Sequence, residues 1–157
     1  MACPRSALPG EREPMHNATM PVPQRITVVT LGARSVPSLR AFYGAMGWEE
    51  NDGSDETYTS FTMGSLRLAL YPIDLLGKEA APRDDVVSSD AWNGVTLGVN
   101  VATREGVDEA FAAAVAAGAE AIESPVERSW GGYSGYFADP EGHRWELAWA
   151  PWFTTFD

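Results

Sequence analysis

Residues 131–147 have the sequence Gly-Gly-Tyr-Ser-Gly-Tyr-Phe-Ala-Asp-Pro-Glu-Gly-His-Arg-Trp-Glu-Leu, and this stretch decides the fold. Two short runs that suit a β-strand flank the segment Asp139-Pro140-Glu141-Gly142, whose residue types favour a turn. The stretch therefore predicts a β-hairpin. In its second strand, Glu146 lies on one face, and its neighbours Trp145 and Leu147 lie on the other.

An earlier segment of the chain repeats this hairpin. Gly64 closes a turn and Leu68 follows four residues later, just as Glu146 follows Gly142. A carboxylate in one copy thus corresponds to a leucine in the other. The repeat predicts two similar modules in one chain.

Each module is predicted to have the element order β-α-β-β-β. In the first, a β-branched strand is followed by a helix that Ser35 caps and Gly47 ends, with three strands after it. In the second, Thr103 caps the helix and Gly118 ends it. The predicted strands span residues 26–31, three segments within 48–71, and 95–101, 119–122, 129–138 and 144–149.

The predicted domain organisation follows from this order. A proline-rich stretch without apolar periodicity precedes the first strand, and a polar, irregular stretch separates the two modules. We predict a disordered extension over 1–23, a first module over 24–72, a linker over 73–93, a second module over 94–152 and a tail over 153–157.

Composition excludes several classes of function. The formal net charge is −11, and such an acidic surface repels nucleic acid but attracts cations. No apolar run is long enough to span a bilayer, and Cys3 is the single cysteine. We therefore expect a cytoplasmic protein without a disulfide, a membrane partner or a nucleic-acid partner.

The hairpin and the first helix resemble the vicinal oxygen chelate superfamily, which includes glyoxalase I, bleomycin-resistance proteins and extradiol dioxygenases. The helix carries this resemblance in Ser38-Leu39-Arg40-Ala41-Phe42-Tyr43 and in Gly47-Trp48. Together they cover residues 25–151. The resemblance implies an α+β fold of two βαβββ modules that form a concave mixed β-sheet groove with helices outside.

The resemblance also implies where a divalent metal ion would be held. In metal-dependent members, one side chain from each of four strands binds the ion, and these positions correspond to Val28, Leu68, Val95 and Glu146. Three aliphatic side chains offer no donor to a metal ion. The chain is therefore expected to belong to a metal-free branch and to need no cofactor. A divalent metal remains the alternative if these positions are assigned wrongly.

Two hypotheses remain open for Glu146. It forms an ion pair with Arg144 or with a cross-strand partner, which stabilises the fold by about 0.5 kcal/mol. Alternatively, it lies in an apolar cavity beside Val28, Leu68 and Val95, where it is a candidate general base or an anchor for a cationic ligand.

The candidate ligand-binding set consists of Glu146, Arg144, Val28, Leu68, Val95 and four aromatic residues. Trp130 and Tyr133 flank two glycines, and Phe61 and Trp48 lie in the first module. Aromatic residues of β-rich domains are more often part of the core, and Trp130 is the best exception because it lies in a loop.

Two functions compete. The first is a sequestration or resistance protein that binds a small, partly aromatic or cationic molecule without metal. The second is an enzyme, either with metal-free proton transfer by Glu146 or as a glyoxalase-like lyase or dioxygenase with an unrecognised metal site. The ligand is left open by the sequence, and so is the oligomeric state, for which a homodimer is one option.

Overall fold

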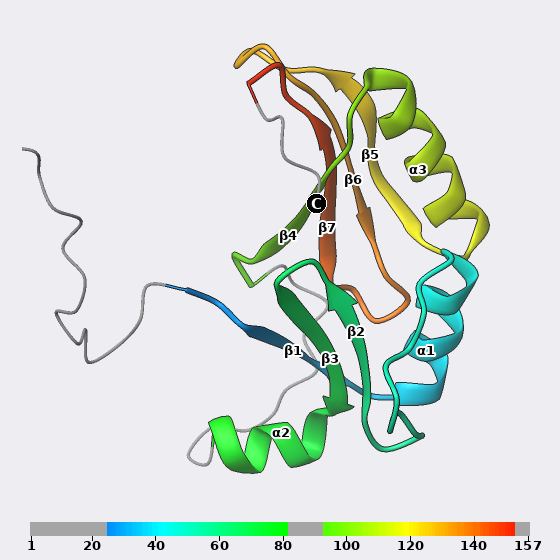
Figure 1. The fold of residues 1–157 in the computed structure, drawn as a ribbon, viewed down its shortest axis with the longest axis vertical. Helices are drawn as coiled ribbons and strands as arrows, with labels where there is room; N and C mark the ends of the chain where they lie inside the picture. The colour runs from blue at the N-terminus through cyan, green and yellow to red at the C-terminus, as the bar shows by residue number, and fades with distance from the viewer. Residues whose placement is uncertain (1–24, 82–92, 153–157) are drawn as a thin grey trace, which may run out of the picture.

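The computed structural model describes residues 25–81 and 93–152, which form two open β-sheets and three helices (Figure 1). The elements are β1 (Val28–Ala33), α1 (Val36–Ala45), β2 (Thr59–Met63), β3 (Leu66–Pro72), α2 (Ile73–Ala80), β4 (Thr96–Asn100), α3 (Arg104–Ala116), β5 (Glu120–Glu127), β6 (Tyr133–Ala138) and β7 (Arg144–Trp149). The predicted α+β class and the two modules are confirmed.

The two sheets share one topology. The first has the strand order β1-β3-β2 and the second β4-β7-β6-β5. In each, the first strand of the module pairs in parallel with the last, which also forms an antiparallel hairpin with the strand before it. Both sheets are therefore mixed, as the resemblance implies.

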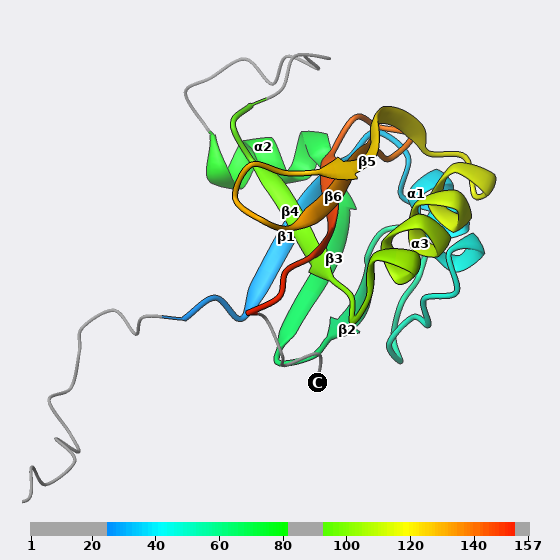
Figure 2. The same cartoon turned by 90° about the horizontal axis from the view of Figure 1, so that it is seen from above.

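The helices begin and end where their caps predict. The side chain of Ser35 accepts a hydrogen bond from the backbone N–H of Ser38, and Thr103 does the same for Gly106. Gly47 follows α1 with φ of 89°, a left-handed conformation that suits glycine. Helices α1 and α3 lie together on one side of the sheets, with α2 away from them (Figures 1 and 2).

One continuous hydrophobic core spans both modules. Tyr43 of α1 is stacked on Trp48, and both rings contact Trp145 of β7 edge to face. Phe61 of β2 and Phe137 of β6 extend the same cluster. The two halves are therefore joined by shared aromatic packing.

The start of the predicted linker is helical. Residues 73–80 form α2, which packs on the face of the first sheet opposite its core. Tyr71 of β3 lies on that face, and its hydroxyl is 3.4 Å from Glu79 of α2. This helix was not predicted, because it is short, contains Gly77 and lacks a side-chain cap; the residues that indicated an irregular segment begin at Pro82, outside the described residues.

The first module has one strand fewer than predicted. Between α1 and β2 only an isolated bridge from Glu50 to Phe61 forms. Polar side chains of this segment bond locally instead: Asp55 accepts hydrogen bonds from Thr57 and from the backbone of Tyr58. Strand β5 also extends to Glu127, and β6 begins only at Tyr133.

Several sequence predictions concern segments outside the described residues. These are the N-terminal extension with Cys3, the second part of the linker and the C-terminal tail. Within the described ranges, no helix has the length and apolar character that crossing a membrane requires.

Candidate functional site

Strand β7 separates its side chains as the sequence predicts. Trp145 and Leu147 are buried on the face toward α3. Glu146 lies on the opposite face, which we call the open face of the second sheet. By strand register this face consists of Thr96, Gly98 and Asn100 of β4, Ser134, Tyr136 and Ala138 of β6, and Arg144, Glu146 and Ala148 of β7.

Glu146 has a cross-strand partner. Tyr136 lies directly opposite it in β6, and the tyrosine hydroxyl donates a hydrogen bond of 2.7 Å to its Oε1. Burial raises the pKa of Tyr136, and the hydrogen bond to Glu146 raises it further. The hydroxyl therefore stays protonated and remains a donor. Among the described residues, Oε2 of Glu146 has no hydrogen-bond or ion-pair partner.

Arg128 supports Tyr136 from the loop before β6. Its Nε donates to the Ser134 hydroxyl at 2.9 Å, and its terminal nitrogen donates to the Ser134 carbonyl and to Glu123, each also at 2.9 Å. The guanidinium lies over the Tyr136 ring, 5.2 Å from its centre. Arg128 thereby stabilises the position of the Tyr136 ring, and the hydroxyl of that ring donates the hydrogen bond to Glu146.

Arg144 lies two residues from Glu146 on the same face but does not pair with it. Its one hydrogen bond among the described residues runs from the guanidinium to the carbonyl of Gly142, at 3.4 Å. No carboxylate of the described residues lies within ion-pair distance of the Arg144 guanidinium. Among the described residues, Glu146 therefore forms a hydrogen bond with Tyr136 and not the expected ion pair, and the charge of Arg144 has no carboxylate partner.

Leu68 does not lie beside Glu146, contrary to the prediction. Its exposed fraction is 2%, and it belongs to the core with Phe61, its partner in β2. The two hairpins differ in their loops, which consist of Gly64 and Ser65 in one and of residues 139–143 in the other. Leu68 and Glu146 are each the third residue of their strand, but β3 turns Leu68 and Leu70 to the core while β7 turns Trp145 and Leu147 to it, so the same offset from the glycine leads to opposite faces.

The other two aliphatic positions are not register partners of Glu146. Val28 begins β1 beside Arg67 in the first sheet, and Val95 precedes β4 with an exposed fraction of 56%. The residues beside Glu146 in the neighbouring strands are Gly98 and Tyr136. The register partners of the carboxylate are therefore a glycine and a tyrosine, and Leu68 of the predicted apolar set lies in the core instead.

Most of the candidate aromatic residues have structural contacts. Phe61 is buried in the core, and Trp48 packs against it. Tyr133 lies on the helix side of its sheet, where its hydroxyl donates to Asp108 of α3. Trp130 is exposed; its ring covers Gly132, where an added Cβ would overlap it, and contacts Trp152 edge to face.

The donor set around Glu146 does not fit a divalent metal site of four ligands. In the described part of the chain, no three His, Cys, Asp or Glu side chains gather in one place. His143, the histidine nearest in sequence, is bonded to Asp139 in the hairpin turn. A bound metal would therefore need ligands other than these residues.

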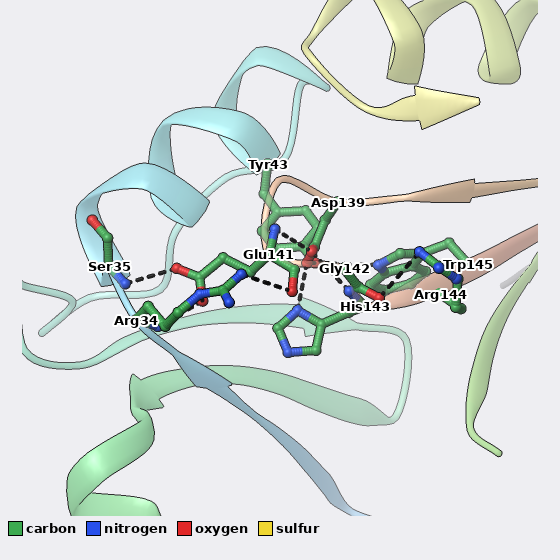
Figure 3. Close-up of polar contacts among 9 residues, drawn as sticks. All are labelled: Arg34, Ser35, Tyr43, Asp139, Glu141, Gly142, His143, Arg144 and Trp145. Atoms are coloured by element: carbon green, nitrogen blue, oxygen red, sulfur yellow. Dashed lines mark hydrogen bonds and ion pairs between the residues drawn. The ribbon is translucent and has the colours of Figure 1, made fainter. Parts of the chain in front are cut away.

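The hairpin turn itself joins the two modules (Figure 3). Asp139 is buried, and its Oδ2 accepts a hydrogen bond of 2.7 Å from the hydroxyl of Tyr43 in α1 and lies 2.7 Å from Nδ1 of His143. Its Oδ1 accepts the backbone N–H groups of Glu141 and His143. Trp145 completes the network by donating its Nε1–H to Tyr43.

Glu141 extends this junction to the start of α1. Its two carboxylate oxygens accept the backbone N–H groups of Arg34 and Ser35 at 2.6 and 2.7 Å. These N–H groups lie at the helix N-terminus, where a negative charge is favourable. The turn of the second module therefore caps the helix of the first.

Comparison with known proteins agrees with this geometry. Residues 25–147 match the model of the Glyoxalase/Bleomycin resistance protein/Dioxygenase superfamily. The chain belongs to this superfamily. The resemblance of its hairpin and first helix is thereby confirmed.

Solved structures share the fold of this superfamily member. A glyoxalase-related enzyme from Fulvimarina pelagi is 28% identical with a TM-score of 0.72, and the match covers 82% of this chain and 89% of that chain. A lactoylglutathione lyase from Agrobacterium tumefaciens is 21% identical with a TM-score of 0.60, and the match covers 85% and 100%. A search of curated proteins finds no match.

Three residues of the site were not predicted from the sequence: Arg128, Ser134 and Tyr136. Tyr136 and Ser134 were available from the hairpin, because pairing Ala138 with Arg144 across the turn places Tyr136 opposite Glu146. Arg128 carries no comparable signal in the sequence. It reaches Ser134 through the irregular pairing of β5 with β6.

Proposed function

We propose that this superfamily member binds a small, cationic and partly aromatic molecule on the open face of the second sheet, with Glu146 as its anchor and without a metal ion. The observation that carries the proposal is the hydrogen bond from Tyr136 to Glu146. It fixes one carboxylate oxygen and leaves the other available to a donor on the ligand.

The surroundings of Glu146 support this choice of ligand. The ring of Tyr136 offers an aromatic surface beside the carboxylate, and the charge of −11 on the whole chain favours the approach of cations. Since the donor set does not fit a family-type metal site, Glu146 is available to the ligand itself.

The test uses phenethylamine, an aromatic cation at neutral pH, in buffer that contains EDTA. We expect Glu146→Gln to weaken its binding about tenfold or more in calorimetry, because a hydrogen bond to a charged group contributes about 1.5–3 kcal/mol. Glu109→Gln on the exposed surface of α3 makes the same change in charge and should leave the affinity unaltered. Equal affinity of both variants would contradict the proposal.

Proton transfer is the second candidate function. The short hydrogen bond between Tyr136 and Glu146 favours it, because a hydroxyl and a carboxylate in contact can serve as acid and base. Turnover of a carbonyl substrate by the wild-type protein in EDTA, lost in Glu146→Gln, would support catalysis over sequestration.

A further inference from the structure

We infer that the ligand of the open face is a zwitterion, a small molecule that carries both an ammonium and a carboxylate group, and that Arg144 binds its carboxylate. This inference rests on the proposed function, because it takes Glu146 as the site of the ammonium group. It adds a second charged contact and so narrows the class of ligand from cations to amino acids and similar amino carboxylates.

The first argument is the charge that Arg144 leaves uncompensated. Each of the other arginines that make described side-chain bonds has a carboxylate: Arg34 has Glu141, Arg40 has Glu50, Arg104 has Glu127 and Arg128 has Glu123. Arg144 has one bond of 3.4 Å to a carbonyl oxygen. A partly buried guanidinium with so few partners is a favourable site for a carboxylate, which it can bind with two parallel hydrogen bonds.

The second argument is the spacing of the two charges. Arg144 and Glu146 stand on one face of β7 with a single residue between them, about 7 Å apart along the strand. Their side chains do not pair, and Glu146 turns to Tyr136 on the neighbouring strand. A short molecule with opposite charges at one end can therefore contact both groups at once.

The third argument distinguishes Arg144 from Arg128, the other cation of the site. Arg128 donates to Ser134 and Glu123 and lies over the Tyr136 ring, so its bonds hold the site together. Binding a ligand carboxylate there would compete with Glu123. Binding it at Arg144 breaks only the weak bond to Gly142.

Three related probes test the inference: phenylalanine has both charges, phenethylamine is phenylalanine without its carboxylate, and 3-phenylpropanoate is phenylalanine without its ammonium group. We expect phenylalanine to bind the full chain about tenfold more tightly than phenethylamine in calorimetry. Arg144→Gln should abolish this difference by weakening the binding of phenylalanine, which loses the partner of its carboxylate. Arg67→Gln, an exposed position in the first sheet with the same change in charge, is the control and should preserve the difference.

The outcomes separate this inference from the proposed function. If phenethylamine binds through Glu146 but phenylalanine binds no more tightly, the zwitterion is wrong and the cation site stands. If Arg144→Gln preserves the preference for phenylalanine, Arg144 is not the carboxylate site. If none of the probes binds, or if Glu146→Gln does not weaken the binding of phenylalanine and phenethylamine, both proposals fail.

Discussion

Replacing Asp139 with alanine is expected to lower the free energy of unfolding by about 3–5 kcal/mol. The carboxylate is buried and accepts hydrogen bonds from Tyr43 and from two backbone N–H groups of its own turn, and it lies against His143. Without it, all of these donors lose their partner inside the protein. Urea denaturation followed by circular dichroism measures the loss.

Two matched variants make this result specific. Tyr43→Phe removes one donor and keeps the acceptor of the others, so it should cost less, about 1–2 kcal/mol. Asp52→Ala removes an exposed carboxylate and should change stability by no more than about 0.5 kcal/mol. A loss at Asp139 as small as that at Asp52 would show that the junction between the modules contributes little to stability.

The same carboxylate should make stability depend on pH. Burial alone would raise the pKa of Asp139, but the hydrogen bonds from His143 and Tyr43 outweigh it and lower the pKa below the ordinary value. The folded state thus binds this proton less readily than the unfolded state. The stabilisation is complete above the ordinary aspartate pKa of about 3.9 and is lost as the pH falls below it. Unfolding of the wild type and of Asp139→Ala across this range measures the difference, which should shrink toward acid pH; a constant difference would contradict the assignment.

Trp145→Ala is expected to destabilise the protein by a similar amount, about 3–5 kcal/mol. The indole is buried between the modules, stacked on Phe137 and in edge contact with Tyr43 and Trp48. Its removal creates a cavity and also deprives the Tyr43 hydroxyl of a donor. The midpoint of thermal or urea unfolding reports the change.

Graded variants separate packing from hydrogen bonding at this position. Trp145→Phe keeps much of the aromatic contact and loses the bond to Tyr43, so we expect a smaller loss than for alanine. Ile26→Ala, at an exposed position before β1, should leave stability within about 0.5 kcal/mol of the wild type. A Trp145→Ala protein as stable as that control would show that the shared aromatic core does not join the modules.

Much of the fold follows from local signals in the sequence. Strand β7 has the bounds and faces that its alternation predicts, and the helix caps Ser35 and Thr103 act as their residue types indicate. These features depend on neighbours a few residues apart, which a pattern can record. Helix α2 was missed because tertiary packing on the first sheet, and not a local cap, stabilises it.

The site was less predictable because it depends on strand phase. Glu146 and Arg144 were found on one face, but Leu68 was placed with them and lies in the core. An internal repeat aligns residues by sequence, while a sheet sorts them by alternate faces, and the two agree only when the strands have the same phase relative to the core. The polar surroundings of Glu146 could be recognised only after the cross-strand register of Tyr136 was known.

The turn that carries Asp139 and Glu141 has a consequence for how such chains are recognised. The polar groups of Asp139 and Glu141 bond to the first module and within the turn itself. In the described part of the chain, none of them bonds to Glu146. A family model that matches this turn therefore recognises the contact between the two modules and not the chemistry of the face that carries Glu146. Related proteins can retain this contact between the modules while the chemistry of the open face changes. Superfamily membership and function therefore depend on different parts of the chain.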